Sequence, residues 1–303
     1  MSVNEAPYIE DTADGEGWRL HLGDSCEWLP RFDPLSVDLS IHSPPFASLY
    51  TYSPSARDIG NCASLDEFST HYSFVIDQLL RVTKPGRLAA VHVAQVPTQK
   101  ARDGYIGLVD FRGAVIASYI AAGWIFHGEI TVQKNPQAQA LRTKAKALLF
   151  VQMEKDSTWS RPALADYVLL FRKPGDNEVP VTPVANAEVT RNDWIEWAHP
   201  AWFGISESAT LNAAAGRDEQ DERHIAPLQL PLIDRAVRLW SNPGELVLSP
   251  FAGIGSEGYQ SVLNGRRFTG IELKPSYWST ACDNLRRAEH DASLPSLFDP
   301  LPA

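Results

Sequence analysis

The sequence has few residues that could form disulfide bridges or bind metal ions. Only three of its 303 residues are cysteine, and none of Cys26, Cys62 and Cys282 belongs to a Cys-x-x-Cys pair. This spacing argues against a disulfide framework and against a structural zinc site. The eight histidines show no metal-ligand spacing, so we expect no metal site. The low cysteine content fits a reduced, cytoplasmic compartment.

Long apolar runs are also missing. The longest mainly apolar stretch, residues 114–126, has 13 residues, whereas a helix that crosses a bilayer needs about 20. The first 17 residues are acidic and lack the basic, apolar leader of a secreted protein. With 44% hydrophobic and 21% charged residues, the composition is that of a globular protein. We therefore expect neither a membrane span nor a secretion signal.

The chain has no overall excess of positive charge. Its formal net charge is −10, which argues against a nucleic-acid binder that relies on electrostatics alone. Residues 130–175 are an exception, because they hold eight basic and three acidic residues. Such a basic face is compatible with a polyanion docked at one place. A solvated helix face explains the same pattern equally well.

Strand and helix patterns alternate along the chain. Residues 18–22 alternate between polar and apolar and predict a strand. Further strands are predicted at residues 37–42, 88–93, 124–132, 167–171, 245–249 and 268–272. A Ser64–Glu67 capping box opens a helix that Lys84-Pro85-Gly86 stops, and further helices are predicted at residues 110–122, 228–240, 256–263 and 276–287. This order predicts an α/β fold with a doubly wound, mostly parallel sheet.

Residues 176–224 interrupt the alternation. They are rich in Pro, Ala, Asn and acidic residues, and no hydrophobic period holds across them. We predict an inserted irregular region that divides one domain into the halves 1–175 and 225–303.

A glycine loop follows the predicted strand 245–249 and opens the next helix. Gly253, Gly255 and Gly258 let the backbone approach a ligand closely, and the helix N-terminus attracts an anion. Glu272 ends the next strand, 19 residues after Gly253, where a carboxylate could bind both hydroxyls of a ribose. A strand–helix turn without a ligand is the alternative. Only 45 residues follow Gly258, whereas a dehydrogenase places this loop first, so the rest of the sheet must come from the N-terminal half.

A second loop, Ser43-Pro44-Pro45-Phe46, follows the predicted strand 37–42. Its two prolines stiffen it and lack N–H donors, so we expect the Pro44 carbonyl to face outward beside the Ser43 hydroxyl. Two acceptors and the flat ring of Phe46 suit the exocyclic amino group of a flipped base. A proline-rich turn without function is the alternative, and the presence of the glycine loop makes it less favoured.

In this order, the motifs resemble the amino-methylating DNA methyltransferases that use S-adenosylmethionine, in their permuted β arrangement. The family's catalytic loop, (Asp/Ser/Asn)-Pro-Pro-(Tyr/Phe/Trp), matches residues 43–46, and its cofactor loop comes last, as residues 250–255 do. Further similar segments are residues 20–25, 81–86, 166–174 and 225–229. The resemblance implies a Rossmann-like methyltransferase sheet with circularly permuted motif order, in which residues 176–224 form the target-recognition region. Residues 42–62 also look like a phage-encoded branch of this family.

The resemblance implies a set of site residues. The implied catalytic residues are Ser43, Pro44, Pro45 and Phe46. The implied cofactor-binding residues are Asp24, Ser25, Pro227, Leu228, Ser249, Phe251, Ala252, Gly253, Gly255 and Glu272. We expect DNA contacts from Tyr50, Tyr52, Arg142, Lys144 and Lys146. The sequence departs from the family at Ser249, where Asp is usual, and at Glu257, where Thr is usual.

The absence of a Pro-Cys pair bears on the type of methylation. Carbon-5 cytosine methylation needs a cysteine nucleophile after a proline, and no cysteine here follows proline. Amino methylation needs only positioning and electrostatics. Serine at the first loop position resembles the branch that methylates N4 of cytosine, with N6 of adenine as the alternative.

Two rival hypotheses are an RNA or protein methyltransferase with the same fold and a non-catalytic DNA-binding relative. The implied cofactor is S-adenosylmethionine and the implied partner is double-stranded DNA. A homodimer and a partner restriction nuclease stay open.

Overall fold

The computed structural model describes residues 8–46, 55, 57–98, 100–137, 154–159, 162–211 and 227–294. In these residues one nine-stranded sheet forms the centre of the molecule, with strand order β1-β2-β11-β10-β3-β4-β8-β7-β9. In that order the strands are β1 (Asp11–Gly15), β2 (Trp18–Leu22), β11 (Arg267–Glu272), β10 (Leu246–Ser249), β3 (Val37–His42), β4 (Thr83–Ala94), β8 (Asp166–Arg172), β7 (Ile125–Val132) and β9 (Ala201–Trp202). Neighbours from β2 to β4 are parallel, whereas β8 runs antiparallel to β4 and β7. The predicted mostly parallel α/β sheet is confirmed.

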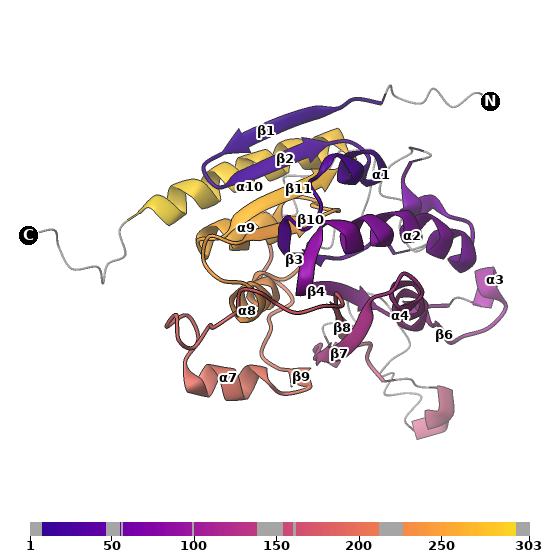
Figure 1. Ribbon diagram of the computed structural model, residues 1–303. Helices are drawn as coiled ribbons and strands as arrows, with labels where there is room; N and C mark the ends of the chain where they lie inside the picture. The colour runs from indigo at the N-terminus through magenta and orange to yellow at the C-terminus, as the bar shows by residue number, and fades with distance from the viewer. Residues whose placement is uncertain are drawn as a thin grey trace, which may run out of the picture.

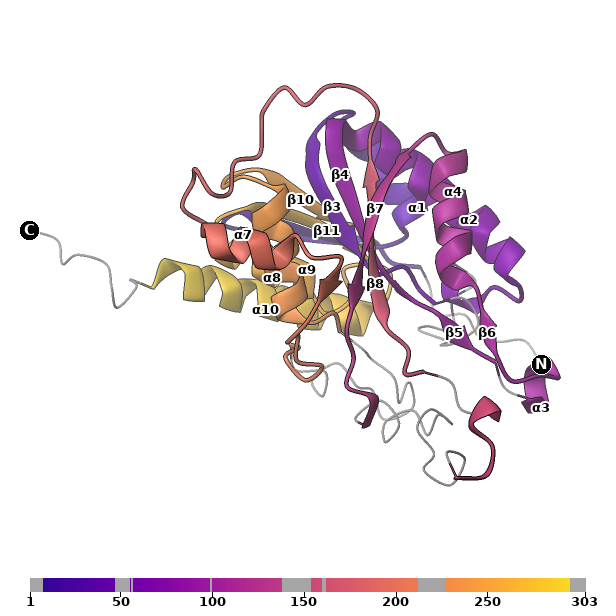
Figure 2. The ribbon, with the colours of Figure 1, turned by 90° about the horizontal axis from the view of Figure 1, so that it is seen from below.

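Helices cover both faces of this sheet (Figure 1, Figure 2). On one face lie α2 (Leu65–Val82) and α4 (Phe111–Ala121), and on the other lie α8 (Leu230–Trp240), α9 (Ser256–Leu263) and α10 (Pro275–Ser293). Each face has its own cluster of buried apolar side chains, so the sheet is doubly wound as predicted. Among the described helices, none is long and apolar enough to span a membrane.

Short elements occupy the connections. They are the helices α1 (Ser25–Trp28), α3 (Lys100–Asp103) and α7 (Arg191–Trp197), the 3₁₀ turns Leu29–Arg31, Ile59–Asn61 and Ser157–Trp159, and the strands β5 (Val96–Pro97) and β6 (Leu108–Val109). β5 and β6 pair with each other in a small separate sheet.

The two ends of the chain interleave in the main sheet. β10 and β11, which come late in the sequence, lie between β2 and β3, which come early (Figure 1). Their pairing is direct: Val247 lies opposite Leu39, and Phe268 lies opposite Trp18. The two ends of the chain therefore form one sheet, although the motifs occur in permuted order. Because parallel strands end at the same edge, the loops after β3, β10 and β11 come together there.

The helix α2 shows how the sequence sets an element's ends. The Ser64 side chain accepts from the Glu67 N–H at 3.1 Å, and the Glu67 carboxylate accepts from the Ala63 N–H at 2.7 Å. The predicted cap is therefore present, but the Glu67 carboxylate accepts from the N–H of Ala63 and not from that of Ser64. The helix ends at Val82, and β4 begins at once, so the Lys84-Pro85-Gly86 turn lies inside this strand. Gly86 takes a φ of +71°, a conformation that favours glycine.

The inserted region is less irregular than predicted. Its described part contains α7 and β9, and β9 pairs in parallel with β7 at the sheet edge. Trp202, in β9, is 1% exposed and belongs to the apolar core. The rest of residues 176–211 lies outside helices and strands, so α7 and β9 are the departures from the predicted irregular region. A strand of two residues shows no hydrophobic period, so the sequence pattern could not reveal it.

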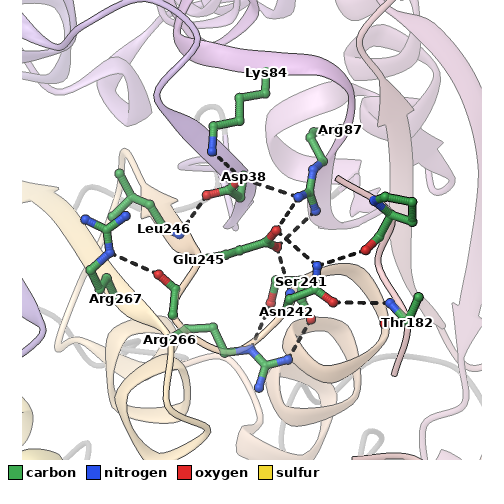
Figure 3. A network of polar contacts seen from close by, with 12 residues as sticks. Asp38, Lys84, Arg87, Thr182, Ser241, Asn242, Glu245, Leu246, Arg266 and Arg267 are labelled. Carbon is green, nitrogen blue, oxygen red and sulfur yellow. Dashed lines mark hydrogen bonds and ion pairs between the residues drawn. The ribbon is translucent and has the colours of Figure 1, made fainter. Parts of the chain in front are cut away.

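A network of charged groups, buried except for the side chain of Lys84, lies at the amino ends of the central strands, opposite the loops just named (Figure 3). Asp38, near the start of β3, accepts from Nζ of Lys84 at 2.6 Å and from the Leu246 N–H at 2.9 Å. Arg87 of β4 forms a two-bond ion pair with Glu245, which precedes β10. This network joins the N-terminal half of the chain to the C-terminal half.

Candidate active site

The carboxyl ends of β3, β10 and β11 and the turn after β2 surround one pocket of about 180 Å³. Both sequence motifs line it, since residues 43–46 follow β3 and residues 250–254 follow β10. Other lining residues predicted from the sequence are Asp24, Ser25, Pro227, Leu228 and Glu272. The fold thus brings together segments that lie more than 200 residues apart in the chain.

The Ser-Pro-Pro-Phe loop enters the pocket directly from the buried strand β3. Pro44 is buried, while Ser43, Pro45 and Phe46 are partly exposed. The Ser43 hydroxyl lies 3.2 Å from the backbone carbonyl of His92 on the neighbouring strand β4. The ring of Phe46 packs on that of Phe111 with centroids 5.5 Å apart. The loop is therefore held by β4 on one side and by α4 on the other.

The three glycines of the other loop have different roles. Gly253 and Gly255 take φ values of +53° and +85°, which favour glycine. Among the described residues other than its chain neighbours, no atom lies within 4 Å of a Cβ added at Gly253, so its backbone is accessible to a ligand. At Gly258 an added Cβ would lie 2.6 Å from both Leu285 and Phe268. The third glycine therefore permits close packing of α9 against the sheet rather than ligand contact.

Glu272 supports the glycine loop from the end of β11. One carboxylate oxygen accepts from the Gly253 N–H at 2.8 Å, and the other accepts from the Lys274 N–H at 2.8 Å. Burial raises the pKa of this carboxyl to about 7. Each carboxylate oxygen can accept a second hydrogen bond, so Glu272 can still accept from a ligand in the pocket.

The turn after β2 joins the pocket through α1. Asp24 caps this helix by accepting from the Cys26 N–H at 2.8 Å, and it forms an ion pair with Arg57 at 3.2 Å. The Ser25 hydroxyl donates to the Pro250 carbonyl at the start of the glycine loop. The first and last parts of the chain are therefore hydrogen-bonded at the pocket itself.

A family model described as DNA methylase matches residues 37–283, which is most of the chain. The chain belongs to this DNA methylase family. Its members methylate amino groups at N6 or N4 of DNA bases. The matched range contains both loops of the pocket and the inserted region between the two halves.

Individual relatives agree with this membership. The type II methyltransferase M1.MboII of Moraxella bovis is 23% identical over 274 residues, which are 87% of this DNA methylase and 94% of the relative. The fold is shared with a DNA modification methylase of Thermus thermophilus solved with S-adenosyl-L-methionine: the TM-score is 0.66 at 23% identity, over 89% of this chain and 93% of that one. It is also shared with the PvuII cytosine-N4-specific DNA methyltransferase, with a TM-score of 0.63 at 18% identity over 91% and 92% of the two chains.

Not every predicted cofactor residue of the DNA methylase lines the pocket. Ser249 is fully buried at the end of β10, and its hydroxyl has no hydrogen-bond partner among the described residues. Gly255 caps α9, where an added Cβ would lie 3.1 Å from Cβ of Ala281. Both residues therefore lie on the side of the glycine loop away from the pocket, and neither lines the pocket.

The predicted DNA contacts lie outside the described residues. This holds for Tyr50 and Tyr52 and for Arg142, Lys144 and Lys146. They stay predictions. No group of three metal-ligating side chains occurs among the residues that the structure does describe.

Sequence reasoning missed several groups at or behind the pocket. Arg57 and Tyr277 line it, although neither belongs to a motif. Glu257, noted only as a departure, is 5% exposed and lines the pocket, and burial raises its pKa to about 8. His92, which belongs to none of the sequence motifs, contacts Ser43 across 49 positions of sequence. No local pattern signals such a contact.

Proposed function

We propose that this DNA methylase transfers a methyl group from S-adenosylmethionine to the exocyclic amino group of a base flipped out of duplex DNA, with N4 of cytosine as the preferred target. The observation that carries this proposal is the single pocket lined by both the Ser-Pro-Pro-Phe loop and the glycine loop. A methyl donor and an amino acceptor must meet in one place, and here both binding elements reach it. The Thermus protein with the same fold was solved with S-adenosyl-L-methionine, which supports the choice of donor.

The residues around the glycine loop fit this cofactor. Open space at Gly253 allows close approach of a ligand to the backbone. The carboxylate of Glu272 has acceptor capacity for ribose hydroxyls. The residues that would hold the cofactor are Asp24, Ser25, Pro227, Leu228, Phe251, Ala252, Gly253 and Glu272, with Ser249 and Gly255 shaping the loop. When bound, S-adenosylmethionine supplies a methyl group activated by a sulfonium.

Ser43 and Pro44 would bind the amino group of the target base. Its two N–H bonds would donate to the Ser43 Oγ and the Pro44 carbonyl, which draws the nitrogen toward a tetrahedral shape. The nitrogen lone pair, otherwise delocalised into the ring, would then be available to form the N–C bond as the methyl group leaves the sulfonium sulfur. The methylated nitrogen would release one of its protons to solvent. Phe46 would stack on the flipped base and hold it there. The rate enhancement therefore comes from positioning and electrostatics, with no covalent intermediate.

The identity of the product tests the proposal. The protein is incubated with duplex DNA and methyl-labelled cofactor, and the labelled nucleoside is identified by mass. N4-methylcytosine is the expected result. If the product is N6-methyladenine instead, the protein is still an amino-methyltransferase, but its target base is adenine. Labelling of RNA with none of DNA would overturn the proposal.

Glu272 should make cofactor binding depend on pH. The ionised carboxylate accepts hydrogen bonds from ribose hydroxyls better than the neutral acid does, and burial places its pKa at about 7. As pH falls through 7 the carboxylate takes up a proton, so the affinity for S-adenosylmethionine should fall, by at most about tenfold per pH unit. Calorimetry between pH 6 and pH 8 measures this.

Substitution separates this effect from other titrations. Glu272→Gln should bind the cofactor more weakly at pH 8, by roughly 1–3 kcal/mol, and should lose the pH dependence. Glu289→Gln is the matched control, because Glu289 bonds the Trp18 indole away from the pocket. Equal affinity and an equal pH profile for wild type and Glu272→Gln would remove Glu272 from cofactor binding.

Phe46 should act on the base and leave the cofactor untouched. Phe46→Ala removes a stacking surface worth roughly 1–3 kcal/mol per base, so we expect a higher KM for DNA and an unchanged Kd for S-adenosylmethionine. Because Phe46 also packs on Phe111, a thermal melt accompanies the assay. Phe46→Trp keeps a flat ring and should retain most of the DNA affinity. An unchanged KM in a folded Phe46→Ala protein contradicts the stacking role.

A further inference from the structure

A chain of polar groups leads from Ser43 into the sheet, away from the pocket. The Ser43 Oγ lies 3.2 Å from the carbonyl oxygen of His92 and 3.3 Å from its Nδ1. On the other side of the ring, Nε2 lies 2.9 Å from Oδ2 of Asp166. The same carboxylate oxygen is 2.6 Å from Nζ of Lys134. β4 lies between β3 and β8, and so its histidine connects their polar groups.

The charge state of Asp166 determines where the hydrogens lie. Burial raises the pKa of this carboxyl, but the neighbouring His92 and Lys134 outweigh burial, and the pKa lies below its ordinary value. An ionised carboxylate can only accept, so Nε2 of His92 must carry the hydrogen that points at it. In the neutral ring Nδ1 is then an acceptor.

With this tautomer, both His92 groups that face the Ser43 hydroxyl are acceptors. The Oγ–H can donate to the His92 carbonyl or to Nδ1, and both acceptors belong to the same residue on β4. In either bond the hydroxyl hydrogen points at His92, and oxygen lone pairs are left for another donor. Such an oxygen is suited to accept from an amino group in the pocket.

We propose that His92 is a positioning residue that holds Ser43 as an acceptor for the target amino group, and that Asp166 and Lys134 fix the tautomer of His92. The inference rests on the proposed function, in which Ser43 receives one amino hydrogen. His92 itself does not line the pocket, so it acts through Ser43 and touches no substrate.

The desolvation cost of burying His92, Asp166 and Lys134 indicates that these polar side chains have a specific role. The side chains of His92, Asp166 and Lys134 are only 10%, 11% and 6% exposed. Burying a charged pair costs desolvation energy, and apolar side chains of similar size would often be as stabilising. A polar chain that ends on the hydroxyl of the Ser-Pro-Pro-Phe loop provides what apolar packing cannot, namely a defined direction for that hydroxyl.

The test compares His92→Phe with His92→Gln in single-turnover methyl transfer to DNA. Phenylalanine fills the space without hydrogen bonds and should slow transfer about 10–100-fold, the usual range for a residue that orients a functional group. Glutamine can accept from Ser43 through its oxygen and donate to Asp166 through its amide, so it should restore most of the rate. The Kd for S-adenosylmethionine should stay unchanged in both variants.

A double-mutant cycle distinguishes positioning from stability. In a Ser43→Ala background His92 has no hydroxyl to orient, so Ser43→Ala/His92→Phe should transfer no more slowly than Ser43→Ala. His127→Gln, an exposed histidine on β7, is the matched control and should behave as wild type. Additive losses, or a glutamine variant as slow as the phenylalanine variant, would overturn the inference. A wild-type protein that transfers no methyl group to DNA would instead overturn the proposed function.

Discussion

Replacing Ser43 by alanine is expected to slow methyl transfer about 10²–10³-fold, the scale for losing one preorganised hydrogen-bonding group at a reacting centre. The substitution removes the Oγ that would accept one amino hydrogen and leaves both prolines in place. The described hydrogen bonds of Ser43 go to His92 on β4, and none goes to the glycine loop. Binding of S-adenosylmethionine should therefore be unchanged.

Single-turnover transfer from labelled cofactor, run beside a thermal melt and calorimetry, measures this. Ser73→Ala is a suitable control, because within the described part of the chain the Ser73 hydroxyl donates to the Thr70 carbonyl of its own helix and to no other group. A structural turn would give another pattern, with melting temperature and cofactor affinity falling together. Near-normal transfer by the Ser43→Ala protein would remove Ser43 from catalysis.

The parts of the site that follow local patterns could be predicted from the sequence. β3 could be predicted with its bounds, Val37–His42, because its apolar residues are followed directly by Ser43 and the two prolines, which mark the end of the strand. The bounds of α9, Ser256–Leu263, follow in the same way from the glycine loop before it. Since parallel strands end at one edge, predicting the two strands also predicted that their loops would meet.

The contacts that tune these loops could not be predicted, because they join residues far apart in the chain. His92 and Asp166 are 74 positions apart and meet only through the pairing of β4 with β8. The hydrogen bond that the Gly253 N–H donates to Glu272 depends on the register of β10 against β11. β9 could not be predicted for another reason: it has only two residues, too few to show a sequence pattern, and it forms only through its pairing with β7.

The permuted order raises the question of what holds the two halves of the sheet together. At the carboxyl ends of the strands, beside the pocket, the Ser25 hydroxyl donates a hydrogen bond to the Pro250 carbonyl and so links the two halves. At the amino ends the network of Figure 3 forms the corresponding link. There Arg87, 2% exposed, pairs with Glu245 across 158 positions of sequence and lies 3.4 Å from Asp38.

Arg87→Met is accordingly expected to destabilise the protein by about 3–5 kcal/mol, the cost of breaking a buried ion pair from one side. The loss arises because Glu245 keeps a charge with no guanidinium beside it, while Asp38 retains Lys84 and the Leu246 N–H. Chemical denaturation monitored by circular dichroism measures the free energy of unfolding. Arg286→Met is the control, because Arg286 forms an exposed ion pair with Asp283 and should change stability by no more than about 1 kcal/mol.

The double variant Arg87→Met/Glu245→Leu shows whether the uncompensated charge is the cause. Removing both partners leaves no buried charge at position 245, but the Asn242 N–H and Nδ2 then lose the carboxylate that accepts from both. The double variant should therefore be more stable than Arg87→Met alone if the uncompensated charge costs more than these two bonds. Because the network lies at the strand ends opposite the pocket, each variant should transfer methyl groups at the wild-type rate per folded molecule, well below its melting temperature. A double variant less stable than the single one would show that the Asn242 bonds to Glu245 outweigh the uncompensated charge. A lower rate in folded protein would show that the amino ends of the strands influence the pocket.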